Sequence, residues 1–351
     1  MGRALRAVPA WAWLTAIVVG SSVLRAVLGG QLVAPFIMVD EVIWSELARG
    51  IADAGEPLLR GQPEPGYSPI YPLLLSPVYA LFESLPAAYA GVKALNAVVM
   101  SLAAVPAYFL ARRVASQGLA LLAALLAVAI PSLVYTGTVM TENVFYPLFL
   151  VFALALVLVL ERPSAVRVVV LLVLLGLAYS TRVQAVALVP AALLAPFALA
   201  LFERRSVGST LSRFRWLYGI VGGLALVGLG ALLVAGRTPK DLLGAYSPVG
   251  DRQYAFGEAL RYVWWHLTEM SLYVLVIPLA ATIVLLGTAR RLDARLQAFL
   301  AASLALSVCL LVVVAAFAAE FSARIEERNR VSVAPLLCLG RVAWLDRGAP
   351  R

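Results

Sequence analysis

Charged residues are scarce in this sequence. Asp, Glu, Lys and Arg make up 13% of the 351 residues, whereas hydrophobic residues make up 62%. A soluble domain carries roughly 25% charged residues, so this composition excludes an ordinary soluble domain. It predicts an integral membrane protein, whose length suits about ten membrane-spanning helices joined by short loops.

Cysteine and histidine are almost absent. The chain contains two cysteines, Cys309 and Cys338, and one histidine, His266. Both cysteines lie in apolar segments and are interpreted as small buried hydrophobic residues, which excludes a disulfide framework. With so few nitrogen and sulfur ligands, a transition-metal site is not expected, and no cofactor is assigned. A divalent cation bound by carboxylates stays open.

Lysine is also nearly absent, since Lys93 and Lys240 are the only two. The net charge of +9 does not indicate nucleic-acid binding, because the arginines fall in short loops between apolar segments. The positive-inside rule then predicts cytoplasmic termini and inner loops that carry Arg112, Arg113, Arg162, Arg167, Arg204, Arg205, Arg213, Arg215, Arg290, Arg291 and Arg295. Most acidic residues fall on the other side, which predicts polar chemistry at the extracytoplasmic face.

The apolar runs predict an all-α fold, a polytopic helix bundle that forms a single transmembrane domain over residues 1–351. Spans are expected at about 10–28, 87–110, 118–137, 143–160, 165–180, 183–202, 216–235, 264–287, 296–318 and 331–345. The spans at 165–180 and 331–345 are short. No internal repeat is visible, although transporters usually contain one.

Two predicted outer loops are long, residues 29–86 and residues 236–263. The first contains apolar residues at four-residue spacing, namely Val39, Ile43, Leu47 and Ile51. This spacing predicts an amphipathic juxtamembrane helix, reaching Ala54, that lies along the membrane surface. The following apolar segment 73–82 is too short to span, so it is predicted to be re-entrant or interfacial.

Two adjacent carboxylates, Asp40 and Glu41, open this helix. Transfer of a sugar requires a base for the acceptor hydroxyl and stabilisation of positive charge on the sugar ring. Adjacent helical residues point about 100° apart, so we interpret Asp40 as the base and Glu41 as a group that orients or binds the acceptor. Alternatively, Asp40 is only an N-cap and Glu41 only interacts favourably with the helix dipole.

Other polar residues lie near the ends of predicted spans. Glu142 opens the fourth span, where it is either a functional group or part of a helix cap. Lys93 and Asn96 share a face of the second span, where Lys93 either contacts a phosphate or snorkels to the interface. Arg182 lies in the outer turn before the sixth span, and arginine suits bidentate phosphate binding.

A second group of polar residues lies late in the chain. Arg324 and Arg328 follow the ninth span, where they either bind phosphate or form ion pairs with Glu326 and Glu327 in a solvated loop. His266 follows two tryptophans, and it is either an interfacial anchor or a substrate ligand.

Taken in order, these segments resemble motifs of the GT-C class of glycosyltransferases, particularly its protein-mannosyltransferase and aminoarabinose-transferase-like group. Asp40-Glu41 resembles the acidic pair after the first span, and Thr141-Glu142-Asn143 resembles the acidic residue that opens the fourth. Three further segments resemble a Pro-Pro-Leu-Tyr-type stretch, a Gly-Leu-Ala-x-Leu-Thr-Arg turn and a Glu-Arg-Tyr stretch: Tyr67-Ser68-Pro69-Ile70-Tyr71-Pro72-Leu73-Leu74, Gly176 to Arg182, and Glu327-Arg328-Asn329. Ser68 and Asn329 depart from the family's Pro and Tyr.

The resemblance implies an enzyme of the cell membrane that moves a sugar from a polyprenyl-phosphate donor to an acceptor hydroxyl on the extracytoplasmic side. It implies that Asp40 is the base. The donor phosphate would be bound by Arg182, Lys93, Arg328 and Arg324, and the substrate by Glu142, Tyr67, Tyr71, Asn96 and His266. A single displacement, with the phosphate leaving opposite the acceptor, would invert the anomeric centre.

The expected partners are the polyprenyl-phosphate-linked sugar, a lipid, glycan or protein acceptor, and membrane lipid. Two alternatives stay open. One is a transporter or flippase for lipids or lipid-linked sugars, and the other is a non-catalytic membrane scaffold.

Overall fold

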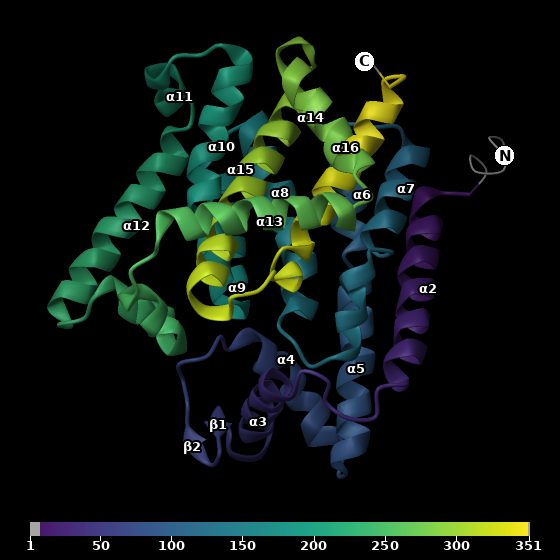
Figure 1. Ribbon diagram of the computed structural model, residues 1–351, viewed down its shortest axis with the longest axis vertical. Coiled ribbons are helices and arrows are strands. Elements are labelled where there is room, and N and C mark those ends of the chain that lie inside the picture. The colour runs from purple at the N-terminus through teal and green to yellow at the C-terminus, as the bar shows by residue number, and fades with distance from the viewer. Residues whose placement is uncertain (1–7, 350–351) are drawn as a thin grey trace. The chain divides into compact units, whose positions relative to one another are not determined.

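The computed structural model describes residues 8–349, with the backbone alone at residues 131–133 and 250–251. Its regular structure is helical, apart from one short hairpin in which Leu58–Leu59 (β1) pairs antiparallel with Gln62–Pro63 (β2) (Figure 1). The predicted all-α class is therefore confirmed. The residues Arg3 and Arg6 near the N-terminus, and the chain's last two residues, lie outside the described part.

The described residues pack as two compact units. Unit 1 contains residues 8–151, 180–182 and 341–349, and unit 2 contains residues 152–179 and 183–340. The boundaries fall inside three helices, α8 (Glu142–Glu161), α9 (Ala165–Thr181) and α16 (Ala334–Asp346). The single transmembrane domain stays a prediction.

Unit 1 is built mainly from helices within the first 151 residues. They are α2 (Ala10–Gly30), α3 (Met38–Ala54), α4 (Ile70–Leu81), α5 (Leu85–Ser101), α6 (Ala104–Arg112) and α7 (Gln117–Ala127), followed by the 3₁₀ helix η1 (Pro131–Gly137) and the start of α8. Helix α2 packs on α5, α3 packs on α4, and α6 packs on α7. The predicted first outer loop thus holds two helices and the hairpin.

Helix α3 begins earlier than the sequence suggested. Its N-cap is Ile37, which makes no side-chain capping bond, and Asp40 is the third helical residue. The interpretation of Asp40 as the N-cap is therefore wrong. The helix ends at Gly55, which takes a left-handed conformation with φ of 76° and donates its N–H to the Ile51 carbonyl. Glycine adopts this conformation without the steric penalty that a Cβ would add.

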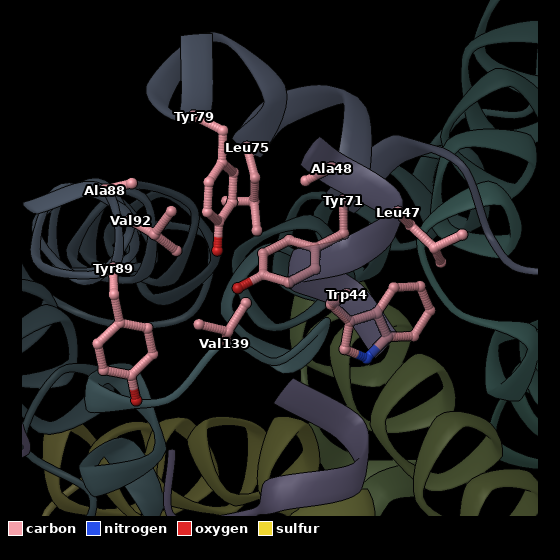
Figure 2. Close-up of a cluster of buried hydrophobic side chains, with 10 residues drawn as sticks. All are labelled: Trp44, Leu47, Ala48, Tyr71, Leu75, Tyr79, Ala88, Tyr89, Val92 and Val139. Carbon is pink, nitrogen blue, oxygen red and sulfur yellow. The ribbon is translucent and has the colours of Figure 1, made fainter. Parts of the chain in front are cut away.

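The buried face of α3 differs from the predicted one. Leu47 is buried as expected, but Val39 is 71% exposed, and Trp44 and Ala48 complete the buried side. Figure 2 shows these residues packed with Tyr71 and Leu75 of α4, Tyr89 and Val92 of α5, and Val139. Aromatic rings therefore dominate the contact between α3 and α4. Whether α3 lies along the membrane surface stays a prediction.

Unit 2 contains the remaining helices. They are most of α8 and α9, η2 (Val183–Ala187), α10 (Leu188–Glu203), α11 (Val207–Arg213), α12 (Arg215–Val234), η3 (Pro239–Asp251), α13 (Phe256–Tyr273), α14 (Ile277–Thr288), η4 (Ala289–Arg291), α15 (Ala294–Phe317), the π-helix η5 (Ala318–Ser322), η6 (Glu327–Asn329), η7 (Val331–Val333) and the start of α16. Helix α15 forms the centre of this unit, since α10 and α13 both pack on it (Figure 1).

Six of the described helices are long and apolar enough to cross a membrane. They are Ala10–Gly30, Leu85–Arg112, Glu142–Glu161, Val183–Glu203, Arg215–Val234 and Ala294–Ser322. A seventh candidate is the pair α13 and α14, whose axes differ by 112° at the break between them. The multi-pass membrane bundle is confirmed, with six or seven candidate spans among the described residues, and the count of ten stays a prediction.

Three predicted spans fall on helices that are too short to meet this criterion. The segment 118–137 divides into the 11 residues of α7 and the separate η1, which begins at Pro131. Proline lacks the N–H that would continue the helical hydrogen bonds. The other two are α9, with 17 residues, and α16, with 13 residues. Sequence hydropathy predicted their positions but not the lengths of their helices.

Candidate functional site

Glu41 is a buried carboxylate that accepts four hydrogen bonds. It has no exposed surface, and its Oε1 accepts the backbone N–H groups of Phe36 at 2.7 Å and Ile37 at 2.8 Å. Its Oε2 accepts the Tyr89 hydroxyl at 2.9 Å and the Val139 N–H at 2.9 Å. Four donors satisfy the two oxygens of an ionised carboxylate. Glu41 thus joins α3, α5 and the segment before α8.

Lys93 of α5 contacts the end of α2. Its side chain is buried, and its Nζ donates to the carbonyl oxygens of Gly29, at 2.8 Å, and Leu32. The same ammonium lies 4.5 Å from the centre of the Tyr89 ring, in a cation–π contact. A cation favours the negative end of a helix dipole. Lys93 is therefore held at the end of α2 by protein contacts, and its predicted contact with a phosphate stays a prediction.

Asn96, also on α5, holds the backbone before α8. Its Nδ2 donates to the Thr138 carbonyl at 3.0 Å, and its amide also pairs with the Tyr71 hydroxyl. Tyr71 has no exposed surface, and burial raises the pKa of its hydroxyl well above the usual value. The prediction that Lys93 and Asn96 share a helix face is consistent with their common burial.

Glu142 and Arg182 form an ion pair within unit 1. Arg182 Nη1 lies 2.6 Å from Glu142 Oε2 and donates to the Thr141 hydroxyl oxygen at 3.2 Å. Glu142 is the first residue of α8, and Arg182 follows the last residue of α9. The side chain of Glu142 is 4% exposed and that of Arg182 is 16% exposed. Both predicted candidates are thus in contact.

Asp40 is half-buried in the first turn of α3. Burial first, and then the nearby carboxylates of Glu64 and Asp40, raise the pKa of the Tyr67 hydroxyl. Asp40 therefore lies within electrostatic reach of Tyr67. Tyr67 packs edge-on against Trp44 with ring centres 5.7 Å apart, and Trp44 packs in the same way on Tyr71 at 6.1 Å. Contiguous contacts therefore connect Tyr67, through Trp44 and Tyr71, to Asn96.

The remaining predicted candidates lie in unit 2, where His266 is fully buried. Its Nε2 accepts the backbone N–H of Glu326 at 3.0 Å, so Nδ1 carries the proton and donates to the Tyr262 carbonyl at 2.7 Å. Arg324 and Arg328 lie 2.9 Å and 3.9 Å from the Glu326 carboxylate. The arginine loop is thus attached to α13 through His266.

The sequence did not single out Glu269 as the partner of Arg330. The two form a close ion pair, and Arg330 Nη1 also donates to the His266 carbonyl at 2.5 Å. Burial lowers the pKa of the Arg330 guanidinium to about 10, which the charge of Glu269 opposes. Arg330 is thus charged at neutral pH. Glu269 and Arg330 are 61 residues apart in the sequence, so no local pattern predicts their pairing. The sequence shows only that each is an ionisable residue near an apolar segment.

Among the side chains that the structure describes, no group of three or more His, Cys, Asp and Glu residues is arranged to hold a metal ion. The open question of a carboxylate-bound cation therefore receives no support from the geometry of these side chains.

Residues 64–229 match the family described as dolichyl-phosphate-mannose-protein mannosyltransferase. The resemblance inferred from the motifs is thereby confirmed. The match covers Tyr67, Glu142 and Arg182 but begins after Asp40.

The fold is similar to that of ArnT from Cupriavidus metallidurans in the apo state, with a TM-score of 0.62 and 16% sequence identity. The similarity covers 96% of this chain and 60% of the ArnT chain, so this protein spans less than two thirds of that protein's length. No curated protein sequence matches the chain.

Proposed function

We propose that this protein is a membrane glycosyltransferase that transfers a sugar from a polyprenyl-phosphate donor to an acceptor hydroxyl. One observation carries the proposal: a single compact unit contains the acidic pair Asp40-Glu41 and the Glu142–Arg182 ion pair, connected by buried polar contacts. A base for the nucleophile and a cation for the leaving phosphate are the two groups that this reaction requires.

In the proposed reaction, Asp40 takes the proton of the acceptor hydroxyl while the hydroxyl oxygen forms a bond to the anomeric carbon of the sugar. The bond from that carbon to the phosphate oxygen breaks, and polyprenyl phosphate leaves with the electron pair. Arg182 stabilises the negative charge on the leaving phosphate, since guanidinium groups pair well with phosphate oxygens. Attack and departure on opposite faces invert the anomeric centre.

Burial argues that several predicted ligands support the site rather than touch the substrate. Lys93, Asn96, Tyr71 and His266 are all buried, and their polar atoms contact the protein. Tyr67, beside Asp40, is the better candidate for a substrate contact because it is only partly buried. Arg324 and Arg328 both pair with Glu326 inside unit 2, and their role as donor phosphate ligands stays a prediction from the resemblance.

We further propose that the site faces the extracytoplasmic side and that both termini are cytoplasmic. The proposal rests on the positive-inside rule applied to the arginine-rich short loops. The acceptor is a lipid, glycan or protein hydroxyl, and its identity does not follow from the fold.

The proposal is tested by turnover of radiolabelled polyprenyl-phosphate sugars in membranes that contain the protein. The expected result is transfer of label to an acceptor in the presence of the wild-type chain, and no transfer above background with Asp40→Asn. Label that crosses reconstituted vesicles without release of polyprenyl phosphate would instead indicate a flippase. Equal transfer by wild type and Asp40→Asn would refute Asp40 as the base.

A further inference from the structure

One peptide group in unit 1, between Thr138 and Val139, is held by three buried side chains. Its carbonyl oxygen accepts the Nδ2 groups of Asn96 and Asn143, each at 3.0 Å, and its N–H donates to Glu41 Oε2 at 2.9 Å. None of the three side chains has any exposed surface. We call this arrangement the Thr138–Val139 clamp.

The clamp joins three helices through one peptide plane. Glu41 comes from α3, Asn96 from α5 and Asn143 from the first turn of α8. A peptide oxygen has two lone pairs and a peptide N–H donates one bond, so these three contacts use the ordinary capacity of the group. Hydrogen bonds weaken steeply outside a narrow range of distance and angle. The clamp therefore fixes the position of this peptide relative to α3 and α5.

Both proposed functional groups lie next to the clamp in sequence. Asp40 precedes Glu41, and Asn143 follows Glu142, the partner of Arg182. The Asn143 side chain also donates to the Met140 carbonyl at 3.1 Å, which fixes the turn that carries Thr141 and Glu142. A displacement of the peptide would thus change the separation of Asp40 from the Glu142–Arg182 pair.

We propose that the Thr138–Val139 clamp is a positioning device that sets the distance between the base Asp40 and the phosphate-binding Arg182. In this role Glu41, Asn96 and Asn143 are positioning residues that act through the peptide and do not contact the substrate. The inference rests on the proposed function, because it requires Asp40 and Arg182 to act on the same substrate. It assigns Glu41 and Asn96 a role different from acceptor or substrate binding.

The test is the kinetics of Asn143→Ala in the full-length protein, expressed per folded molecule. A misplacement of about 1 Å can cost about 100-fold in rate, so kcat/KM for the polyprenyl-phosphate donor should fall by about 10- to 100-fold. The matched control is Tyr146→Phe, on the same helix. It removes a buried hydrogen bond to the Ala127 carbonyl but leaves the clamp intact, and it should keep kcat/KM within about two-fold of wild type.

The decisive measurement repeats Asn143→Ala in the Arg182→Ala background. If the clamp acts by positioning Arg182, the two effects are not additive, and Asn143→Ala should have at most a ~3-fold effect when Arg182 is absent. Equal effects of Asn143→Ala in both backgrounds would overturn the inference. So would a wild-type kcat/KM in the single variant.

Asn96→Ala provides the second variant, because it removes one of the two donors to the Thr138 carbonyl and leaves Asn143 in place. If neither variant yields folded protein, the clamp is a folding element and the positioning role is refuted. A different result would refute the proposed function itself: the Asp40→Asn variant would still transfer sugar. An inactive Asp40→Asn together with additive clamp effects would refute the clamp alone.

Discussion

The guanidinium of Arg182 lies 2.6 Å from the carboxylate of Glu142, and the two residues stand at adjoining ends of different helices. Because the Glu142 side chain is almost completely buried, its charge is compensated chiefly by the arginine rather than by water. A phosphate that binds Arg182 therefore has to share the guanidinium with Glu142. Because the two charges depend on each other, the effects of variants at Arg182 and at Glu142 must be interpreted together.

The first prediction concerns this pair. Arg182→Ala should weaken use of the polyprenyl-phosphate donor by about 10- to 100-fold, because a charge-assisted contact contributes about 1.5–3 kcal/mol. Arg182→Lys should lose less, since it keeps the charge but not the bidentate geometry. Initial rates across donor concentrations measure the effect.

Loss of Arg182 also leaves Glu142 without its compensating charge, so stability requires its own control. The double variant Arg182→Ala/Glu142→Gln removes both charges and should unfold at a higher temperature than Arg182→Ala alone. Its donor use should remain impaired. Recovery of wild-type donor kinetics in the double variant would show that Arg182 serves only to neutralise Glu142.

The second prediction concerns the buried pair of Arg330 and Glu269. Arg330→Met should lower the free energy of unfolding by about 3–5 kcal/mol, because it leaves the Glu269 carboxylate unpaired. The double variant Arg330→Met/Glu269→Leu should recover much of that loss, since paired removal replaces both charges with apolar groups. Thermal unfolding in detergent measures both. A double variant less stable than Arg330→Met would contradict the pairing.

The third prediction concerns Gly50 on α3. A Cβ at this position would lie 2.5 Å from the Leu58 nitrogen and 2.8 Å from the Glu56 carbonyl oxygen, so the hairpin could not keep its place against the helix. Gly50→Ala should therefore destabilise the protein by about 1–3 kcal/mol. Gly222→Ala on α12, where a Cβ would meet no atom within 4 Å, is the control and should be neutral or stabilising. Equal unfolding temperatures for the two variants would refute the close approach.

The sequence predicted the helical class, the general positions of the spans and the acidic pair, because each depends on local composition and periodicity. It could not predict the environment of Glu41. Of its four donors, the Tyr89 hydroxyl and the Val139 N–H come from segments far away in the chain. Such contacts depend on tertiary packing, which periodicity does not encode.

The predicted apolar face of α3 was partly wrong for a related reason. A four-residue spacing selected Val39 together with Leu47, but α3 packs on α4 through Trp44, Leu47 and Ala48 and leaves Val39 exposed. The position of the partner helix therefore decides which stripe is buried. For Glu142 and Arg182, the sequence predicted only that both lie on the same side of the membrane. It could not predict their salt bridge, because an ion pair between two helices has no sequence pattern.

The fourth prediction concerns orientation. Glu56→Cys, on an exposed part of the first predicted outer loop, should react with an impermeant thiol reagent added to intact cells. Arg291→Cys, exposed in a predicted inner loop, should react only after permeabilisation. The native thiols Cys309 and Cys338 are buried, so their background labelling should be low. Labelling of Arg291→Cys alone in intact cells would invert the proposed topology.

The last prediction concerns Asp40 itself. Asp40 is the third residue of α3 and not its N-cap, so Asp40→Asn should remove the proposed base with only a small loss of favourable dipole interaction, about 0.3–1 kcal/mol. The base role predicts a folded protein that still binds donor and whose transfer rate falls about 100- to 10,000-fold. Glu46→Gln provides the matched control. That carboxylate lies on the same helix, but it accepts the N–H of Arg60 at the hairpin, so transfer should remain near the wild-type rate. Donor binding, unfolding temperature and the anomeric configuration of the product by NMR complete the comparison. A retained configuration would exclude the single displacement from the opposite face, whereas equal rates in the two variants would leave Asp40 without a catalytic role.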